Sequence, residues 1–339
     1  MKQTTSADEF ADFLNQSIAE MIASIEDAKK DCDGKSIIEK PSGGMPNCGK
    51  IKGQPEATTI KNSTLFAEYT QNREAIEDLF ENPNLNGQLS ELLIYQRLAL
   101  IDLFYGTNVF RMRQFGLEEL ASAIWSGCYD ATTDAHSDAI LANKAISFVN
   151  APSDHHLIHT DLFAKSYGYV VDTTGVHSQF AESLLSKYLF FLVNAHGDKV
   201  GFPIYDSIVR GLSKKIGKKL GLPVTKNGTM HELTALLNSI LAELKSRNGG
   251  LWQNLPKGIK SQYDLLDYFL WRIGKVGRFS FSQIISRSEF AQYCPVFVVL
   301  KQIQANKNWP KKKKEQEMRK KLGRLPAKYK RWHDIYTKI

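Results

Sequence analysis

The stretch from Glu182 to Leu220 holds the residues whose types and spacing could support a reaction. An apolar helix expected over 182–193 ends at a polar loop, and Pro203 then forces an extended approach to Asp206. Asp206 or Ser207 is suited to cap the helix that follows, and the positive end of the helix dipole there favours an ionised Asp206 carboxylate. Asp206 is therefore either a cap alone or a carboxylate held ready for chemistry.

The helix expected over 207–220 is basic along one side, because its Lys and Arg residues recur at steps of four or lie beside that row. Those expected to contact phosphates are Arg210, Lys214, Lys215 and Lys218. Residues 207–231 include no acidic residue, so the positive charges repel one another unless a polyanion lies against them. A solvated helix surface is the alternative. A carboxylate at the mouth of such a helix favours a reaction on a nucleic acid.

The order of apolar helix, loop, proline-preceded aspartate and basic helix resembles the helix-hairpin-helix DNA glycosylase superfamily. In that superfamily the aspartate is the catalytic carboxylate, and Asp206 occupies its place here. Four segments are also similar to a glycosylase-like group of bacterial proteins that is linked to defence against phage with modified DNA bases. They are Phe104–Asn108, Ser186–Leu189, Phe202–Ser207 and Leu265–Trp271. The likeness covers residues 85–300.

The resemblance implies an N-glycosylase that acts on a damaged or modified base flipped out of DNA. Cleaving the base–sugar bond builds positive charge on the sugar, which Asp206 would stabilise while orienting a water for attack. Bifunctional members use a lysine that forms a Schiff base with the sugar, and Lys187 precedes Asp206 by 19 residues, which resembles their spacing. An alignment on residues 186–188 instead puts Ser183 at the nucleophile position. Both kinds of chemistry stay open.

The same resemblance suggests residues for binding the phosphate backbone and the flipped base. The superfamily hairpin usually reads Leu-Pro-Gly-Val-Gly, and residues 173–177 keep one of its two glycines, Gly175, whose backbone could approach a phosphate closely. Aromatic rings that could stack on the base are Tyr105, Tyr205, Tyr268 and Trp271. Each of these rings is otherwise a core residue.

The elements that must position these residues are predicted to be helices. Apolar residues recur at helical spacing over 6–30, with Ser6 and Glu9 as a capping box. Further helices are expected over 89–104, 117–126, 138–149, 182–193, 207–220, 230–244 and 263–273. Strict alternation is rare, so no sheet is expected. The fold class is therefore all-α, a helix-hairpin-helix glycosylase-like multi-helix domain with an N-terminal helix and a basic tail.

Composition divides the chain into four parts. These are an amphipathic helix in 1–33, a Gly- and Pro-rich linker or long loop in 34–63, the helical domain in 64–300 and a tail in 301–339. The tail holds 14 Lys/Arg and 3 Asp/Glu, a net of +11, whereas the remaining 30 bases and 33 acids give −3. Lys311, Lys312 and Lys313 begin its basic cluster, which would add affinity for nucleic acid that does not depend on base sequence.

Several classes of function are disfavoured. The four cysteines include no Cys-x-x-Cys pair, and the run from His155 to His159 lacks the metalloprotease glutamate, so no metal site is expected. No phosphate-binding loop is found, so neither a nucleotide nor another cofactor is expected. The chain shows no apolar run of membrane-spanning length and no apolar signal core near Met1, so we expect a cytoplasmic protein with no membrane partner.

Three functions compete for this pattern. The first is the DNA glycosylase-like enzyme, and the second is a non-catalytic DNA-binding protein on the same scaffold. The third is an RNA-binding or toxin-like protein whose acidic N-terminal helix masks its basic tail. Deleting residues 1–33 should strengthen nucleic-acid binding only in the third case.

Overall fold

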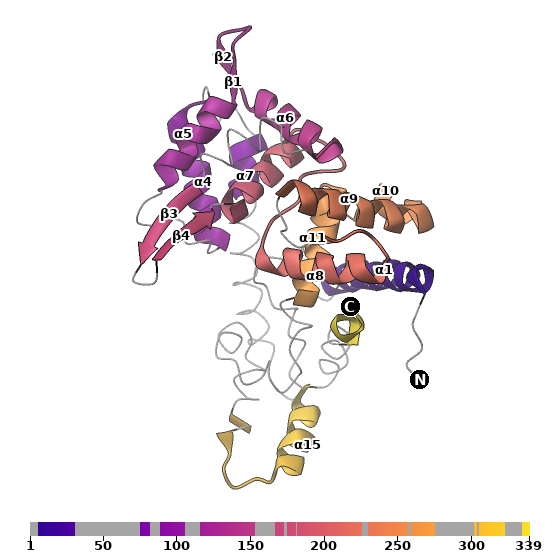
Figure 1. Ribbon diagram of the computed structural model, residues 1–339. Coiled ribbons are helices and arrows are strands. Elements are labelled where there is room, and N and C mark those ends of the chain that lie inside the picture. The colour runs from indigo at the N-terminus through magenta and orange to yellow at the C-terminus, as the bar shows by residue number, and fades with distance from the viewer. Residues whose placement is uncertain are drawn as a thin grey trace. The chain divides into compact units, whose positions relative to one another are not determined.

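The computed structural model describes twelve stretches of the chain (Figure 1). They are residues 6–30, 75–81, 89–105, 116–152, 167–172, 175–180, 182–225, 230–256, 259–274, 302–303, 305–322 and 334–339. The expected linker at 34–63 lies outside them. The chain forms two compact units, the first from Met1–Asn15 with Asn72–Asp267 and the second from Gln16–Gln71 with Tyr268–Ile339. The domain limits expected from the sequence stay predictions.

The described residues are mostly helical, which confirms the α-helical class, whereas the helix-hairpin-helix arrangement stays a prediction. The helices that lie wholly in the first unit are residues 75–81, α4 (Glu91–Tyr105), α5 (Leu117–Gly127), α6 (Asp138–Asn150), α7 (Glu182–Ala195), α8 (Ser207–Lys219), α9 (Met230–Arg247) and α10 (Gly249–Gln253). The start of α1 (Ala7–Lys30) and of α11 (Gln262–Arg272) also belong to it. Helix α4 packs on α5 and α7, α6 on α7 and α9, and α9 on α8 and α10.

Two antiparallel hairpins correct the expectation that no sheet forms. Strand β1 (Tyr129–Asp130) pairs with β2 (Ala135–His136), and β3 (Tyr167–Asp172) pairs with β4 (Gly175–Phe180). In the second hairpin Asp172 is opposite Gly175, so only two residues connect the strands, a length typical of tight hairpins. Strand β3 is rich in aromatic and β-branched residues, which favour a pleated chain even without strict alternation.

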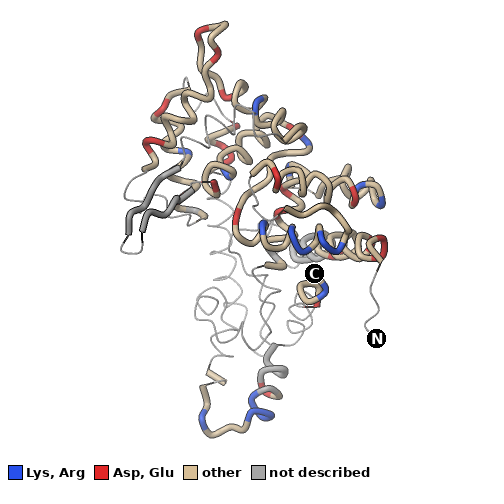
Figure 2. Tube along the Cα trace, in the orientation of Figure 1, with Lys and Arg blue, Asp and Glu red and all other residues tan. Residues whose placement is uncertain are grey.

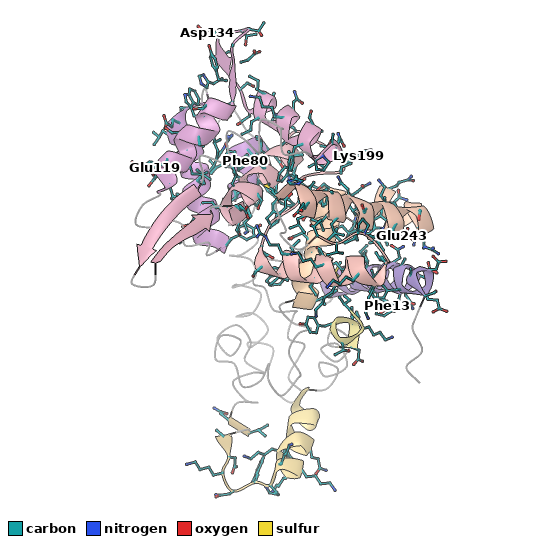
Figure 3. All side chains as sticks on the ribbon, in the orientation of Figure 1. Phe13, Phe80, Glu119, Asp134, Lys199 and Glu243 are labelled. Atoms are coloured by element: carbon teal, nitrogen blue, oxygen red, sulfur yellow. The ribbon has the colours of Figure 1, made fainter. Side chains whose placement is uncertain are left out.

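Local hydrogen bonds explain where several helices begin. At the start of α1, Glu9 N–H donates to Ser6 Oγ (3.2 Å) and Ser6 N–H to Glu9 Oε2 (3.1 Å), so the predicted capping box is confirmed. Ser137 caps α6 by accepting from Ala139 N–H at 3.2 Å. Behind these caps the apolar faces form the core of the first unit, where Phe80 lies among the packed side chains (Figure 3).

The second unit carries the basic tail. Helix α15 (Lys311–Leu322) begins directly after Pro310, whose backbone oxygen accepts from Lys314 N–H at 3.1 Å. A further helical turn spans residues 334–338, and Ile335 and Ile339 are buried there. The predicted break between these two helices, at Pro326, lies outside the described residues.

Candidate active site on helices α7 and α8

Helix α7 lies in the interior, because Leu184 to Asn194 are all buried. The chain leaves it through a loop in which Asp198 Oδ1 accepts two backbone N–H bonds at 2.8 Å, from Val200 and Gly201. Gly201 has φ +81°, and a Cβ there would lie 2.2 Å from Ser261 Oγ, so glycine is required by both conformation and space. These contacts fix the position at which the segment leading to α8 begins.

The segment 202–205 is buried and ends at Asp206, which caps α8 as predicted. Asp206 Oδ1 accepts from Ile208 N–H at 2.9 Å and from Val209 N–H at 2.8 Å. Both capping bonds use Oδ1, so the cap does not occupy Oδ2 of this half-buried carboxylate. The cap and a chemical role are therefore compatible in one side chain.

Lys187 projects from α7 into the interior and is only 5% exposed. Its Nζ donates to the backbone oxygen of Ser183 at 3.1 Å and to Ser183 Oγ at 2.6 Å, one turn earlier in α7. Nζ also lies 5.2 Å from the centre of the Tyr105 ring, which comes from α4. A buried ammonium is thus held by neutral oxygens and an aromatic face.

Burial lowers the pKa of the Lys187 amine below its usual value of 10.5. The negative charges of Asp206, Asp267 and Asp102 act in the other direction, but burial outweighs them. A lowered pKa increases the share of neutral amine, which is the form that attacks an electrophile. Asp206, the predicted catalytic carboxylate, is therefore one of the charges that act on the Lys187 amine.

A chain of hydrogen bonds runs from Lys187 to the backbone N–H of Tyr205, the residue before Asp206. Tyr205 N–H, next to Asp206, donates to Ser186 Oγ at 3.0 Å, and Ser186 Oγ donates to the backbone oxygen of Ser183 at 3.2 Å. That same oxygen accepts from Lys187 Nζ. Neither serine was predicted to have this role, although the short motif around Ser186 and Lys187 had been singled out.

The four aromatic residues proposed for a base pocket have different surroundings. Tyr105 and Trp271 are half-buried, and Tyr105 faces Lys187. Tyr205 and Tyr268 are fully buried, and the Tyr205 hydroxyl is hydrogen-bonded to Thr234 Oγ1. Burial raises the pKa of Tyr205. The Tyr105 ring is therefore placed against a predicted catalytic group.

Lys and Arg residues recur along α8, as the blue segments of Figure 2 show, and several of their side chains are exposed. Lys215 and Lys218 are exposed, and Lys214 is half-buried. Arg210 instead forms an ion pair with Glu182, at the start of α7. Sequence reasoning missed this partner because it precedes the acid-free stretch and meets α8 only in the folded chain.

The remaining predicted phosphate contacts are on other elements. Gly175 is the first residue of β4, in a β-hairpin and not in a turn between helices. Lys311, Lys312 and Lys313 are exposed on α15, where Lys313 Nζ lies 4.7 Å from the centre of the Trp309 ring. The tail cluster belongs to the second unit, and Gly175 and α8 belong to the first.

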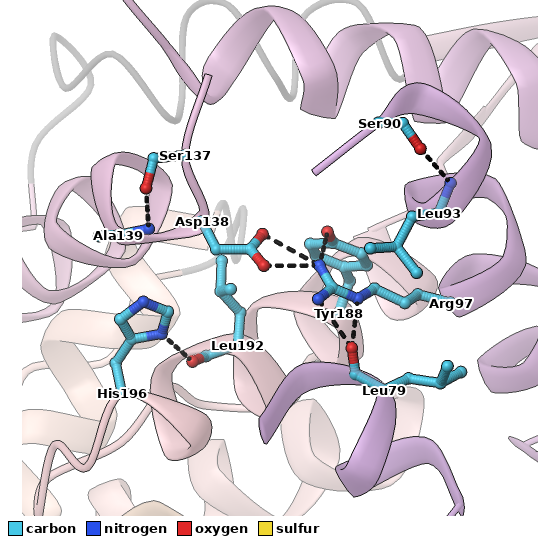
Figure 4. A network of polar contacts seen from close by, with 10 residues as sticks. All are labelled: Leu79, Ser90, Leu93, Arg97, Ser137, Asp138, Ala139, Tyr188, Leu192 and His196. Carbon is cyan, nitrogen blue, oxygen red and sulfur yellow. Dashed lines mark hydrogen bonds and ion pairs between the residues drawn. The ribbon is translucent and has the colours of Figure 1, made fainter. Parts of the chain in front are cut away.

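A second buried cation, Arg97 of α4, is 2% exposed and was not predicted (Figure 4). Its Nη1 donates to both oxygens of Asp138, at 3.0 and 2.8 Å, and to the Tyr188 hydroxyl at 3.3 Å. Nε and Nη2 donate to the backbone oxygen of Leu79 at 2.9 and 2.7 Å. The guanidinium also lies 4.4 Å from the centre of the Phe80 ring. These contacts join α4, α6, α7 and residues 75–81.

Comparisons with known proteins add no constraint, because no protein-family model, curated protein or solved structure matches this chain. Among the residues that the structure describes, no three His, Cys, Asp or Glu side chains are grouped to hold a metal ion. The run from His155 to His159 lies outside the described residues. Within the described ranges no helix is long and apolar enough to cross a membrane.

Proposed function

We propose that this protein is a DNA glycosylase-like enzyme that cleaves the N-glycosidic bond of a damaged or modified base. The observation that carries the proposal is the buried Lys187 amine, whose pKa is lowered, acted on by the carboxylate that caps α8. An amine of this kind can act as the nucleophile at a sugar carbon, and a fixed carboxylate can stabilise the positive charge that develops there. Residues 85–300 resemble such enzymes, and the proposed place in phage defence rests on that resemblance alone.

The reaction would start with the target base outside the helical stack, in contact with Tyr105. As the bond from C1′ to the base breaks, the base leaves with the electron pair and takes up a proton. Asp206 stabilises the positive charge that this leaves on the sugar. Either a water oriented by Asp206 or the lone pair of Lys187 Nζ then bonds to C1′. In the water route the water loses a proton, and an abasic sugar remains in the strand. In the amine route the nitrogen bonded to C1′ loses one proton, its lone pair then expels O4′, which takes up a proton, and a protonated Schiff base remains.

Double-stranded DNA is the proposed partner. The exposed side chains of Lys215 and Lys218 support binding to phosphates along α8, the helix that Asp206 caps. Lys311, Lys312 and Lys313 would add contacts that do not depend on base sequence. No cofactor is required by either route.

The test is base release, measured by mass spectrometry, from DNA that carries a panel of damaged and phage-type modified bases. Wild type should release a free base, and Asp206→Asn should lower that rate by about 100-fold or more while DNA binding persists. Asparagine caps helices as well as aspartate, so α8 should stay intact. Asp198→Asn is the matched control, because Asp198 also accepts two backbone N–H bonds but caps only a loop.

The outcome also separates the competing functions. No release from any substrate, with salt-sensitive DNA binding retained, would favour a non-catalytic DNA-binding protein. The third function, in which the N-terminal helix masks the basic tail, has less support, because the start of α1 is anchored in the first unit. Asn15 Nδ2 donates to the backbone oxygen of Leu244 at 2.9 Å, and Asn15 Oδ1 accepts from Trp252 Nε1 at 3.1 Å. A helix held by buried hydrogen bonds is costly to displace.

A further inference from the structure

The amine of Lys187 has an unusual pair of partners. Both hydrogen bonds described for Nζ go to one residue, Ser183, at 2.6 Å for Oγ and 3.1 Å for the backbone oxygen. Ser183 is half-buried, whereas Lys187 is buried, so the serine lies closer to solvent than the amine that it holds. An i, i+4 pair on α7 is close enough for this contact without any change in the helix.

The two hydrogen bonds to Ser183 fix the direction of the third N–H of the Lys187 ammonium. The nitrogen of a lysine is tetrahedral, so acceptors at two N–H positions turn the third position away from Ser183. That third position becomes the lone pair when the amine loses its proton. We propose that Ser183 is a positioning residue that fixes Nζ of Lys187 and aims its reactive position away from the start of α7.

Ser183 also connects the amine to the carboxylate. Its backbone oxygen accepts from Ser186 Oγ as well as from Lys187, and Ser186 holds the backbone N–H of Tyr205, next to Asp206. One pair of serines on α7 therefore contacts both Nζ and the backbone N–H of Tyr205, whereas Asp206 is held by its own cap bonds to α8. As the inference concerns how Lys187 is held, its use in catalysis rests on the proposed function, but its test does not.

The charged and aromatic groups around Nζ allow us to predict how Ser183→Ala changes the pKa of Lys187. Asp206, Asp267 of α11 and Asp102 of α4 all favour the ammonium, and the Tyr105 ring lies on the α4 side. Oxygens that accept from an ammonium also favour the charged form. Removing Ser183 Oγ should therefore lower the pH at which the amine loses its proton, and these carboxylates would remain.

The experiment is competitive labelling of the folded protein with acetic anhydride across pH, read at Lys187 by peptide mass spectrometry. Ser183→Ala should move the midpoint of labelling down by about half a pH unit, the size expected from losing one modest hydrogen bond. Ser183→Thr keeps a hydroxyl and should restore the wild-type midpoint. Ser186→Ala removes a neighbouring serine that does not contact Nζ, and should leave the midpoint in place.

An unchanged midpoint in Ser183→Ala would overturn the inference, as would an equal shift in Ser186→Ala. With a reactive DNA substrate, borohydride trapping of the Schiff base should slow about tenfold in Ser183→Ala, because the amine is less well aimed. The two failures are distinguishable. If wild type neither releases a base nor is trapped, the proposed function fails, whereas the labelling result still decides the role of Ser183.

Discussion

Arg97 and Lys187 are both buried cations in the first unit, at 2% and 5% exposure, yet they are held in opposite ways. Arg97 donates to an ionised carboxylate, a backbone oxygen and a phenol, in the fork geometry that a guanidinium offers. The hydrogen bonds described for Lys187 go to neutral oxygens of a single serine. The contacts of Arg97 stabilise its positive charge, whereas those of Lys187 allow the amine to lose a proton.

Their pKa values move in opposite directions for this reason. Burial acts to lower the pKa of Arg97, but its contacts with Tyr188 and Asp138 outweigh burial and raise it. Burial also lowers the pKa of Lys187, and there the charges of the nearby carboxylates do not restore it. The contrast teaches that burial alone does not mark a reactive cation; the kind of partner decides between a structural charge and a reactive amine.

The largest expected effect comes from breaking the Arg97 cluster. Arg97→Met should lower the free energy of unfolding by about 3–4 kcal/mol, because the half-buried Asp138 loses its charge partner and the Leu79 oxygen loses two donors. Urea unfolding monitored by circular dichroism would measure this loss. Arg247→Met is the matched control, since Arg247 pairs with Asp8 and Glu243 nearer the surface and should matter far less. If Arg97→Met lowers the free energy of unfolding no more than Arg247→Met does, Arg97 is not a structural charge.

Lys187→Met should change the free energy of unfolding by less than about 1 kcal/mol at pH 7. Methionine keeps an apolar stem and removes a charge that is costly to bury, while the lost attraction of three carboxylates opposes this gain. The same variant should abolish trapping on DNA. A loss of stability as large as that of Arg97→Met would show that Lys187 is a structural charge after all.

The pH dependence of stability sharpens this test. The folded pKa of Lys187 lies below the unfolded value of 10.5, so between the two values the unfolded chain binds the extra proton. Stability should rise as pH increases through that window in wild type, relative to Lys187→Met. Burial raises the pKa of Cys128 from 9.0 to about 12, so this thiol lowers stability above pH 9. That loss is common to both proteins and cancels in their difference, measured by urea unfolding from pH 7 to 10.5.

The helices and caps of this molecule are predictable because their causes are local. The Ser6–Glu9 box, the Asp206 cap and the starts of α5 and α6 follow from residues within one or two turns of each other. The hairpins escaped prediction because short strands give weak periodicity. Of the candidate site, Asp206 and Lys187 follow from spacing and resemblance, and in the folded chain the charge of Asp206 acts on the Lys187 amine.

The Arg97 cluster and the partner of Arg210 could not be predicted from the sequence. Arg97 meets Asp138 across 41 residues and Tyr188 across 91, and Arg210 meets Glu182 across 28. No local pattern reports such pairs. The burial of the Tyr205 and Tyr268 rings likewise depends on how helices pack, which residue type alone leaves open.

The smallest expected effect, an unchanged labelling midpoint, tests whether the two cations are independent, since Tyr188 of the Arg97 cluster directly follows Lys187 in α7. Tyr188→Phe removes the hydroxyl that Arg97 contacts at 3.3 Å but keeps the ring against Phe80, so the loss should be about 1 kcal/mol. Successive residues of a helix point about 100° apart, which separates the two side chains. The labelling midpoint of Lys187 should therefore stay at its wild-type pH. A shift there as large as that of Ser183→Ala would mean that one network sets both charges, and the division between structural and reactive cations would have to be abandoned.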